Sequence, residues 1–319
     1  MLRKFAYNKI FRTTGMLLLF LMLLLFPVSK EYSLEDENVV KTSVTEAKTE
    51  VFLLDKDGFI ARTKVDMKNE EDSVKTATKL IELLITSGKY EQKIPNGFKA
   101  VLPSDTKINE VVIDKENITI DLSGDILELN EEMFNKALEA ITYNLTTIDG
   151  VKYVYLKVDG KVLEKNPTNN KIIKWPLSRQ NGINKTYDVV SYKDVSSTTV
   201  YYVNKNNNGY YYVPVTKLSN DKRDKIKIIV DELTSSHIYE TNLMSFLNYN
   251  TKLINYELKD GILTLNFNEF LFDDTSSKSI LEEVIYSIAL SVRDNYDVDE
   301  VVFTVDGNEI TKSVIKNIE

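Results

Sequence analysis

The only histidine, His237, is the side chain best suited to acid–base chemistry at neutral pH. It follows Thr234, Ser235 and Ser236, so the chemistry that this spacing would allow is a hydroxyl nucleophile activated by an imidazole. Such catalysis also needs an oriented base, and a position at the end of an expected helix favours a helix cap instead. The chain has no cysteine, which excludes thiol catalysis, thiolate metal sites, disulfides and a lipid-modified N-terminal cysteine.

Clustered carboxylates are the next candidates, either for a hard cation or for glycoside hydrolysis. The segment Asp55–Gly58 resembles the start of a calcium loop but lacks the later ligands, so we expect a turn. Asp273-Asp274, and Asp297 with Asp299 and Glu300, are interpreted as solvated acidic faces rather than weak cation sites. No pair stands out among the 48 acidic residues, and the chain has no glycine-rich phosphate loop. The sequence therefore assigns no catalytic, cofactor-binding or metal-binding residue.

Two aromatic features suggest binding rather than catalysis. The run Tyr210-Tyr211-Tyr212 has the composition of a sugar-stacking surface, but its position in an expected strand makes a half-exposed sheet face the simpler interpretation. The only tryptophan, Trp175, lies in a segment rich in proline and polar residues. We expect it to pack that linker onto a neighbouring domain, the alternative being an interface anchor.

The charge of the chain limits its partners. The net charge at pH 7 is −8, and four basic residues, Arg3, Lys4, Lys9 and Arg12, precede an apolar run at the N-terminus. The remainder is therefore even more acidic, whereas nucleic acids and anionic lipid surfaces both attract a basic face. We expect no nucleic-acid partner.

Residues 1–30 are expected to be a targeting segment. The apolar run Gly15–Val28 is short for a membrane span of about 20 residues and also suits a signal peptide. Because no small-residue cleavage site follows it, we expect an uncleaved single-pass anchor, with a secreted, cleaved protein as the alternative. The positive-inside rule then places the rest of the chain, beginning with a polar tether at 31–48, outside the cytoplasm.

The rest of the chain is a duplication. Leu102–Ser123 matches Leu247–Asn268 without a gap. Three further blocks match in the same order: Thr49–Leu53 with Thr198–Tyr202, Ile60–Val65 with Val213–Leu218, and Val154–Gly160 with Val301–Gly307. The offset between the copies changes only between elements, where loops absorb length differences. The sequence therefore predicts two homologous modules, at 49–165 and 198–314, joined by a linker at 166–197.

Both modules show the same periodicities, which predict a strand pair, a helix, two strands, a second helix and a last strand ending in Asp-Gly. The expected elements of the first module are strands at 51–54 and 59–65, a helix at 74–85, strands at 108–113 and 118–122, a helix at 134–145, and a strand at 154–158. In the second module the expected strands lie at 200–203, 210–218, 253–258, 262–267 and 301–305, and the expected helices at 226–233 and 281–292. One-sided helices and alternating strands predict an α+β fold, in which each module is a mostly antiparallel sheet with two helices on one face.

These blocks resemble the GerM domain family of sporulation and spore-germination proteins. The resemblance is carried by Val51-Phe52-Leu53 and Val200-Tyr201-Tyr202, by Leu102-Pro103 with Thr106, and by Gly150-Val151 with the closing Val158-Asp159-Gly160. It covers both modules, and it implies a fold similar to ring-building folds in a membrane-tethered, extracytoplasmic protein of an envelope complex. The chain departs from the family in having no cysteine for a lipid anchor. It also has Leu247-Asn248 where the first module has Leu-Pro, which predicts a looser turn.

Two classes of function remain open. The one we favour is non-enzymatic assembly of a sporulation, germination or cell-envelope complex through protein–protein contacts, since no acidic or aromatic cluster recurs in both modules. It includes self-association of modules that meet head to tail. The alternative is a cell-wall (peptidoglycan) binding module or hydrolase accessory. Neither function requires a cofactor.

Overall fold

A computed structural model describes residues 48–68, 70–235 and 241–314. The expected N-terminal anchor, nearly all of the tether and His237 lie outside these residues. Among the helices in the described ranges, none combines the length and the apolar composition that crossing a membrane requires.

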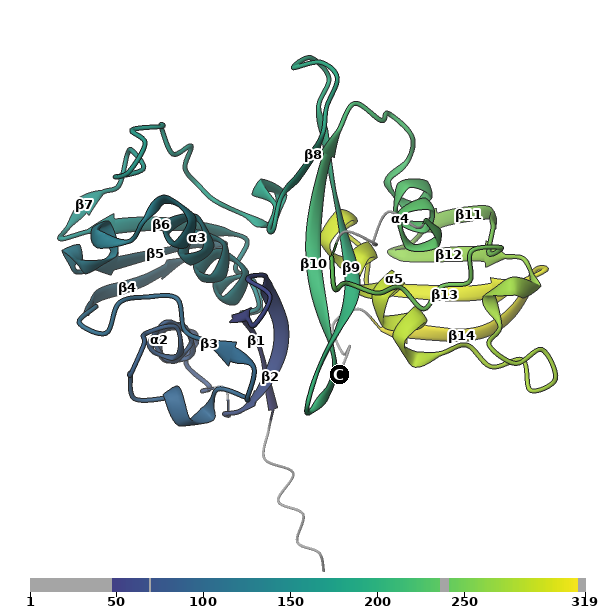
Figure 1. Cartoon of the computed structure of the whole chain (residues 1–319), viewed down its shortest axis with the longest axis horizontal. Coiled ribbons are helices and arrows are strands. Elements are labelled where there is room, and N and C mark those ends of the chain that lie inside the picture. Colours follow the sequence, from purple (N-terminus) through teal and green to yellow (C-terminus); the bar gives the residue numbers. More distant parts are fainter. Residues whose placement is uncertain (1–47, 69, 236–240, 315–319) are drawn as a thin grey trace, which may run out of the picture. The chain divides into compact units, whose positions relative to one another are not determined.

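Each repeat contains the elements that its periodicity predicts, with short additions (Figure 1). The first repeat consists of β1 (Lys48–Asp55), β2 (Ile60–Asp66), α2 (Ser73–Leu83), β3 (Phe98–Lys99), β4 (Ile108–Asp114), β5 (Asn117–Leu122), α3 (Glu131–Leu145), β6 (Tyr153–Val158) and β7 (Lys161–Val162). After a linker that includes β8 (Thr186–Asp188), the second repeat consists of β9 (Ser196–Asn206), β10 (Gly209–Ser219), α4 (Lys225–Thr234), β11 (Leu253–Lys259), β12 (Ile262–Phe267), α5 (Glu282–Asn295), β13 (Glu300–Val305) and β14 (Asn308–Val314). Short 3-10 turns lie at Glu91–Lys93, Gly124–Glu128, Arg179–Asn181 and Glu269–Leu271.

Each repeat has its own four-stranded sheet, with the same strand order in both. The orders are β4-β5-β6-β7 and β11-β12-β13-β14. Within each sheet only the central pair, β5–β6 or β12–β13, is parallel, because the second helix crosses over between those two strands. The α+β fold with two repeated modules is thus confirmed. Ile141 of α3 and Ile288 of α5 are buried at equivalent places in the core.

The opening hairpins do not join these sheets. The strands β1–β2 and β9–β10 form a third sheet, in which the order is β3-β1-β2-β10-β8 and β9 pairs with the other edge of β10. The strands β2 and β10 are equivalent in the two repeats, and they pair antiparallel with Arg62 opposite Tyr212. This is the arrangement of a two-fold symmetric dimer, in which the same edge of each copy forms the contact. Within this chain the two modules therefore meet through equivalent strands rather than head to tail. Head-to-tail association between chains stays a prediction.

The duplication extends to single hydrogen bonds. In the first repeat Asp121 of β5 accepts a bond from the Gly160 amide at 3.0 Å. In the second, Asn266 of β12 accepts one from the Gly307 amide at 2.9 Å. Both glycines have positive φ, +78° and +81°, which a residue with a side chain rarely adopts. The Asp-Gly turn that closes each repeat is therefore fixed to the sheet in the same way.

The turn expected to be looser in the second repeat closes as the first one does. The Thr106 amide donates to the Pro103 carbonyl at 3.2 Å, and the Thr251 amide donates to the Asn248 carbonyl at 2.9 Å. Asn248 also accepts a bond from the Asn250 amide through its side chain, at 2.9 Å. The prediction of a looser turn is wrong, since an asparagine side-chain bond fixes the backbone where proline does so in the first repeat.

A buried polar side chain on the second helix of each repeat holds the opening strand. The amide of Asn144 on α3 bonds both the N–H and the C=O of Phe52, at 3.0 and 2.7 Å. On α5, Ser291 accepts a bond from the Tyr201 amide at 2.8 Å. Tyr201 occupies the place of Phe52, so each hairpin is attached to its own repeat by an equivalent contact.

Candidate functional site

The carboxylate of the expected turn at 55–58 holds local structure. Asp55 accepts bonds from the backbone amides of Asp57 and Phe59, at 2.9 and 2.8 Å, which confirms the turn. Its other oxygen accepts hydrogen bonds from the Tyr211 hydroxyl at 2.9 Å and from the side-chain amide of Asn204 at 3.3 Å. This buried carboxylate therefore ties the first hairpin to the second and is fully engaged.

The other acidic candidates lie at the surface. Asp274 accepts bonds from the amide and hydroxyl of Ser276, and these bonds hold the pKa of its carboxyl below the usual value. Asp297 and Asp299 are exposed, and Glu300 pairs with a lysine of β14 at 3.6 Å. Within ranges 48–68, 70–235 and 241–314, no three His, Asp or Glu side chains converge as metal ligands would.

The aromatic candidates are mostly packed. Tyr210 is 47% exposed, whereas Tyr211 is buried and Tyr212 is partly buried, so the run presents one ring rather than a stacking surface. Trp175 donates its indole N–H to the Leu163 carbonyl at 2.6 Å, and its ring stacks on Tyr155. It packs the linker onto the first repeat, as expected.

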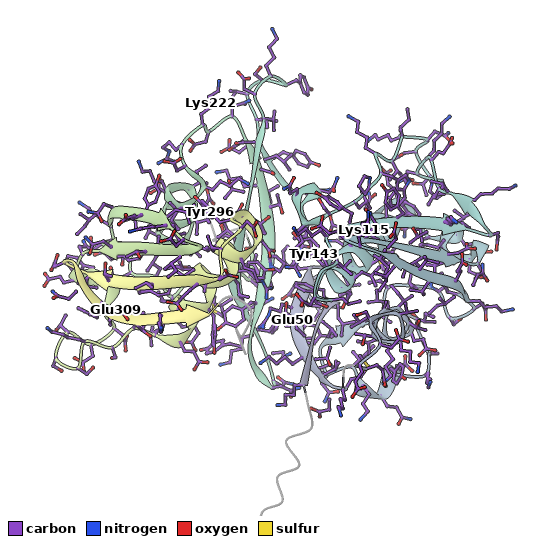
Figure 2. All side chains as sticks on the ribbon, turned by 180° about the vertical axis from the view of Figure 1, so that it is seen from behind. Glu50, Lys115, Tyr143, Lys222, Tyr296 and Glu309 are labelled. Atoms are coloured by element: carbon purple, nitrogen blue, oxygen red, sulfur yellow. The ribbon has the colours of Figure 1, made fainter. Side chains whose placement is uncertain are left out.

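Sequence reasoning missed the most distinctive polar site, a largely buried group of charges between the repeats, which lies in the region of Glu50 and Tyr143 in Figure 2. We call it the junction cluster; its members are Glu50, Arg62, Arg179, Arg293 and Asp294. They come from β1, β2, the linker and α5. The available signal was weak, because β1 and β2, which contain Glu50 and Arg62, also carry other charged and polar residues.

Glu50 connects the two repeats directly. Its carboxylate accepts two bonds from Arg293, at 2.9 and 3.2 Å, and lies 2.8 Å from the guanidinium of Arg62. Burial alone would raise the pKa of Glu50, but the two guanidinium groups more than reverse this effect. The pKa therefore lies well below its ordinary value, and Glu50 is a carboxylate at any physiological pH.

Asp294 is the second acidic centre of the cluster, and its side chain is fully buried. It accepts a bond from Arg179 at 2.6 Å and one from the Tyr201 hydroxyl at 2.8 Å. The Arg179 guanidinium also lies 4.8 Å from the centre of the Tyr143 ring. Burial, reinforced by the charge of Asp294, raises the pKa of Tyr201, so this hydroxyl remains a neutral donor.

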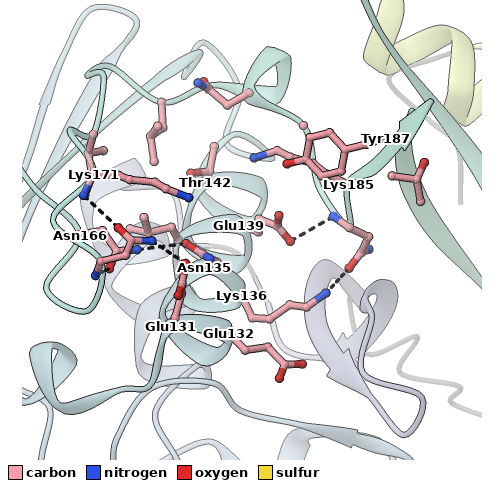
Figure 3. Close-up of a pocket in the computed structure, with 18 of the residues that line it drawn as sticks. Glu131, Glu132, Asn135, Lys136, Glu139, Thr142, Asn166, Lys171, Lys185 and Tyr187 are labelled. Atoms are coloured by element: carbon pink, nitrogen blue, oxygen red, sulfur yellow. Dashed lines mark hydrogen bonds between the residues drawn. The ribbon is translucent and has the colours of Figure 1, made fainter. Parts of the chain in front are cut away.

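Beside the cluster, a groove of about 570 Å³ runs along α3 and the linker (Figure 3). Asn184 is one of the residues that line it, and its side chain bonds the N–H and C=O of Ile60 and the C=O of Pro214, at 2.7 to 2.9 Å. It thereby links β2 to β10. Lys136 donates a hydrogen bond to the side-chain oxygen of Asn184 at 2.8 Å, and the Glu139 carboxylate accepts one from the backbone N–H of Asn184 at 3.1 Å.

These two ionisable groups in the groove have displaced pKa values. Burial lowers the pKa of Lys136 and raises that of Glu139. Such shifts mark many catalytic sites, but structural ion-pair networks produce them too. Here both groups already form hydrogen bonds with Asn184, which links β2 to β10. We therefore interpret them as structural groups at the junction of the repeats.

Replacing Glu50 by glutamine is expected to make the free energy of unfolding depend less on pH in the acidic range. Because the folded-state pKa lies below the ordinary value of 4.5, the carboxylate stabilises the fold fully above about pH 5.5, and this contribution is lost as the pH falls through the folded pKa. The variant should therefore be less stable at pH 7, and the difference should shrink below about pH 4.5. Urea unfolding between pH 7 and pH 3 measures this, with exposed Glu110→Gln on β4 as the control. A constant difference across the range would contradict the assignment.

Comparisons with known proteins agree with this architecture. Residues 50–164 and 199–311 match the Germane family, described as sporulation and spore germination. The chain is 33% identical over 266 residues to the spore germination protein GerM of Bacillus subtilis strain 168, covering 81% of this chain and 71% of that protein. The solved structure of the tandem GerMN domains of the sporulation protein GerM from Bacillus subtilis superposes with a TM-score of 0.74 at 32% identity. That match covers 82% of this chain and 92% of the solved one.

Proposed function

The chain belongs to the Germane family of sporulation and spore germination proteins, and we propose that it acts there by assembling an envelope complex through protein–protein contacts. In this proposal it has no enzymatic activity. Its own N-terminal segment anchors it in the membrane, and both repeats lie outside the cytoplasm.

The observation that carries the proposal is the junction cluster. Glu50 with Arg293 and Asp294 with Arg179 are ion pairs between different parts of the chain; the Asp294 side chain is fully buried and the other three are partly buried. Together with the β2–β10 pairing they hold the repeats in one fixed spacing. A rigid pair of modules suits a scaffold, because little conformational entropy is lost when a partner contacts both.

The internal contact also argues for a partner other than another module. An isologous contact is closed, since each copy uses the same edge and none remains for a third copy. In this chain β2 and β10 use that edge internally. Assembly must then proceed through outer surfaces, which are free to contact a different protein.

The test uses the full-length protein, tagged at its C-terminus, in the organism that produces it. After cross-linking, we expect it to co-purify with membrane proteins that have extracytoplasmic domains. Its retention on purified peptidoglycan should not exceed that of an unrelated protein of similar charge. A strict monomer that captures no envelope protein but binds or hydrolyses glycan strands would support the cell-wall alternative instead.

The anchor has its own test. We expect the mature protein to retain its N-terminus and to fractionate with membranes, with the repeats accessible to protease added outside the cytoplasmic membrane. A mature N-terminus beginning after Ser29 would replace the anchor with a cleaved signal peptide.

A further inference from the structure

The linker ends in a projection with solvent-exposed apolar side chains. We call residues 187–195 the finger; in Figure 1 it forms the upper end of the ribbon beyond β8. Val190 is 93% exposed and Tyr192 101%, and Tyr187 and Val195 are also exposed. Surface loops are usually polar at their tips, so several large apolar side chains on one projection require an explanation.

One side chain organises the tip of the finger. Asn220, which follows β10, accepts bonds from the amides of Val190 and Ser191, at 2.8 and 3.1 Å. It also donates to the carbonyls of Ser191 and Lys193, at 2.9 and 2.8 Å. Four backbone groups at the tip are therefore satisfied by a single residue. The turn holds its shape without burying its apolar side chains.

The base of the finger is fixed to the second repeat. The short strand β8 pairs in parallel with the end of β10. Lys217 of β10 bonds both Asp188 of β8 and Glu232 of α4, at 3.0 and 2.8 Å. Nearer the tip, Asp194 pairs with Lys222 at 2.9 Å. The finger is thus a preformed element on a rigid support.

We propose that the finger is a docking element, in which Val190 and Tyr192 enter an apolar pocket on another envelope protein. This inference rests on the proposed function. A preformed loop loses little conformational entropy on binding, and a rigid tyrosine combines a large contact area with few rotatable bonds. Such aromatic anchors carry much of the binding energy at protein interfaces.

The surroundings of the tip favour a protein over a lipid bilayer. Membrane insertion usually combines a larger apolar face with several basic residues. At the finger, Asp188 and Asp194 flank the apolar side chains and pair with Lys217 and Lys222, which leaves the exposed Lys193 as one basic residue at the tip rather than several. A protein pocket with polar rim groups matches this pattern of apolar centre and paired charges.

The experiment places a photo-cross-linking amino acid at position 192 of the full-length protein and, as a control, at position 249. Tyr249 is a comparably exposed tyrosine, 78% exposed, in a loop of the second repeat. We expect position 192, and not position 249, to cross-link to a membrane or envelope protein that mass spectrometry identifies. The cross-linked peptide should line an apolar pocket of that protein.

Affinity measurements with the purified partner then test whether Val190 and Tyr192 contribute to binding. Tyr192→Ser and Val190→Ser are each expected to weaken the affinity at least tenfold, whereas Tyr249→Ser should change it less than twofold. Unchanged thermal unfolding of the variants would show that the fold persists. If the wild-type protein binds the partner and the finger variants bind it equally well, the finger is not the docking element, although the proposed function stands. If the wild-type protein captures no envelope protein at all, the proposed function itself fails.

Two further outcomes would also overturn the finger proposal. Cross-links from position 192 to a second copy of this chain, with a dimer in solution, would make the finger a self-association element. Co-sedimentation with vesicles of neutral and anionic phospholipid that is lost in Tyr192→Ser would make it a membrane contact.

Discussion

Replacing Asp294 by alanine is expected to destabilise the protein by about 3–5 kcal/mol, the range for removing one partner of a buried ion pair. The loss arises because Arg179 then keeps a largely buried positive charge without its carboxylate partner, and the Tyr201 hydroxyl loses its acceptor. Urea unfolding followed by circular dichroism measures the change. The matched control is Asp297→Ala, three residues further on and exposed, which should change stability by less than about 0.5 kcal/mol.

A second variant distinguishes two causes of this destabilisation: the lost attraction between Asp294 and Arg179, and the cost of leaving the Arg179 charge without a partner. If the unpaired guanidinium is the cause, Asp294→Ala combined with Arg179→Met should be more stable than Asp294→Ala alone. If instead the double variant loses the sum of the two single losses, the two residues do not act as a pair. That result would remove this ion pair from the account of how the repeats are joined.

Replacing Ile288 by aspartate is expected to unfold both repeats together. Ile288 is fully buried on α5, and an ionised side chain at that position has no partner, which costs more than about 4 kcal/mol. Considered alone, the sequence predicts loss of the second module only. The junction cluster changes this expectation, because α5 supplies Arg293 and Asp294 to the first repeat and the linker.

Hydrogen exchange with mass spectrometry distinguishes the two expectations. In Ile288→Asp we expect faster exchange in β5 and β6 of the first repeat as well as in β12 and β13. The exposed Ile254→Asp on β11 should leave both patterns unchanged. Normal protection in the first repeat of Ile288→Asp would show that the repeats fold independently and that the cluster contributes little to their coupling.

The sequence predicted individual elements well because their apolar residues repeat with helical or strand periods. The helices around Ile141 and Ile288, and the strands that contain Leu156 and Phe303, all lie where the periodicity places them. Periodicity does not show which strand edges of the two repeats pair with each other. The pattern of β2 or β10 shows an apolar strand but not that the two strands pair with each other, since such a contact depends on the free edges of both repeats.

The same limit applies to the candidate site. Arg293 and Asp294 have no charged counterparts in the first repeat, where Thr146 and Thr147 stand, so comparing the repeats could not single them out as a pair. Glu50 lies 243 positions from Arg293, and no spacing rule connects them. The finger was missed for a different reason: Val190 and Tyr192 belong to a segment without periodicity, and their exposure depends on the bonds of Asn220.

The pairing of β2 with β10 has a consequence for biosynthesis. A chain that emerges N-terminus first exposes β2 as an open edge until β10 follows about 150 residues later, an interval on the order of ten seconds at the usual speed of translation. Open apolar edges recruit strands from other nascent chains, and a charged side chain on the edge strand is a common deterrent. Arg62 stands on β2 where Tyr212 of β10 will eventually pair with it. We expect Arg62 to act as such a deterrent until that strand arrives.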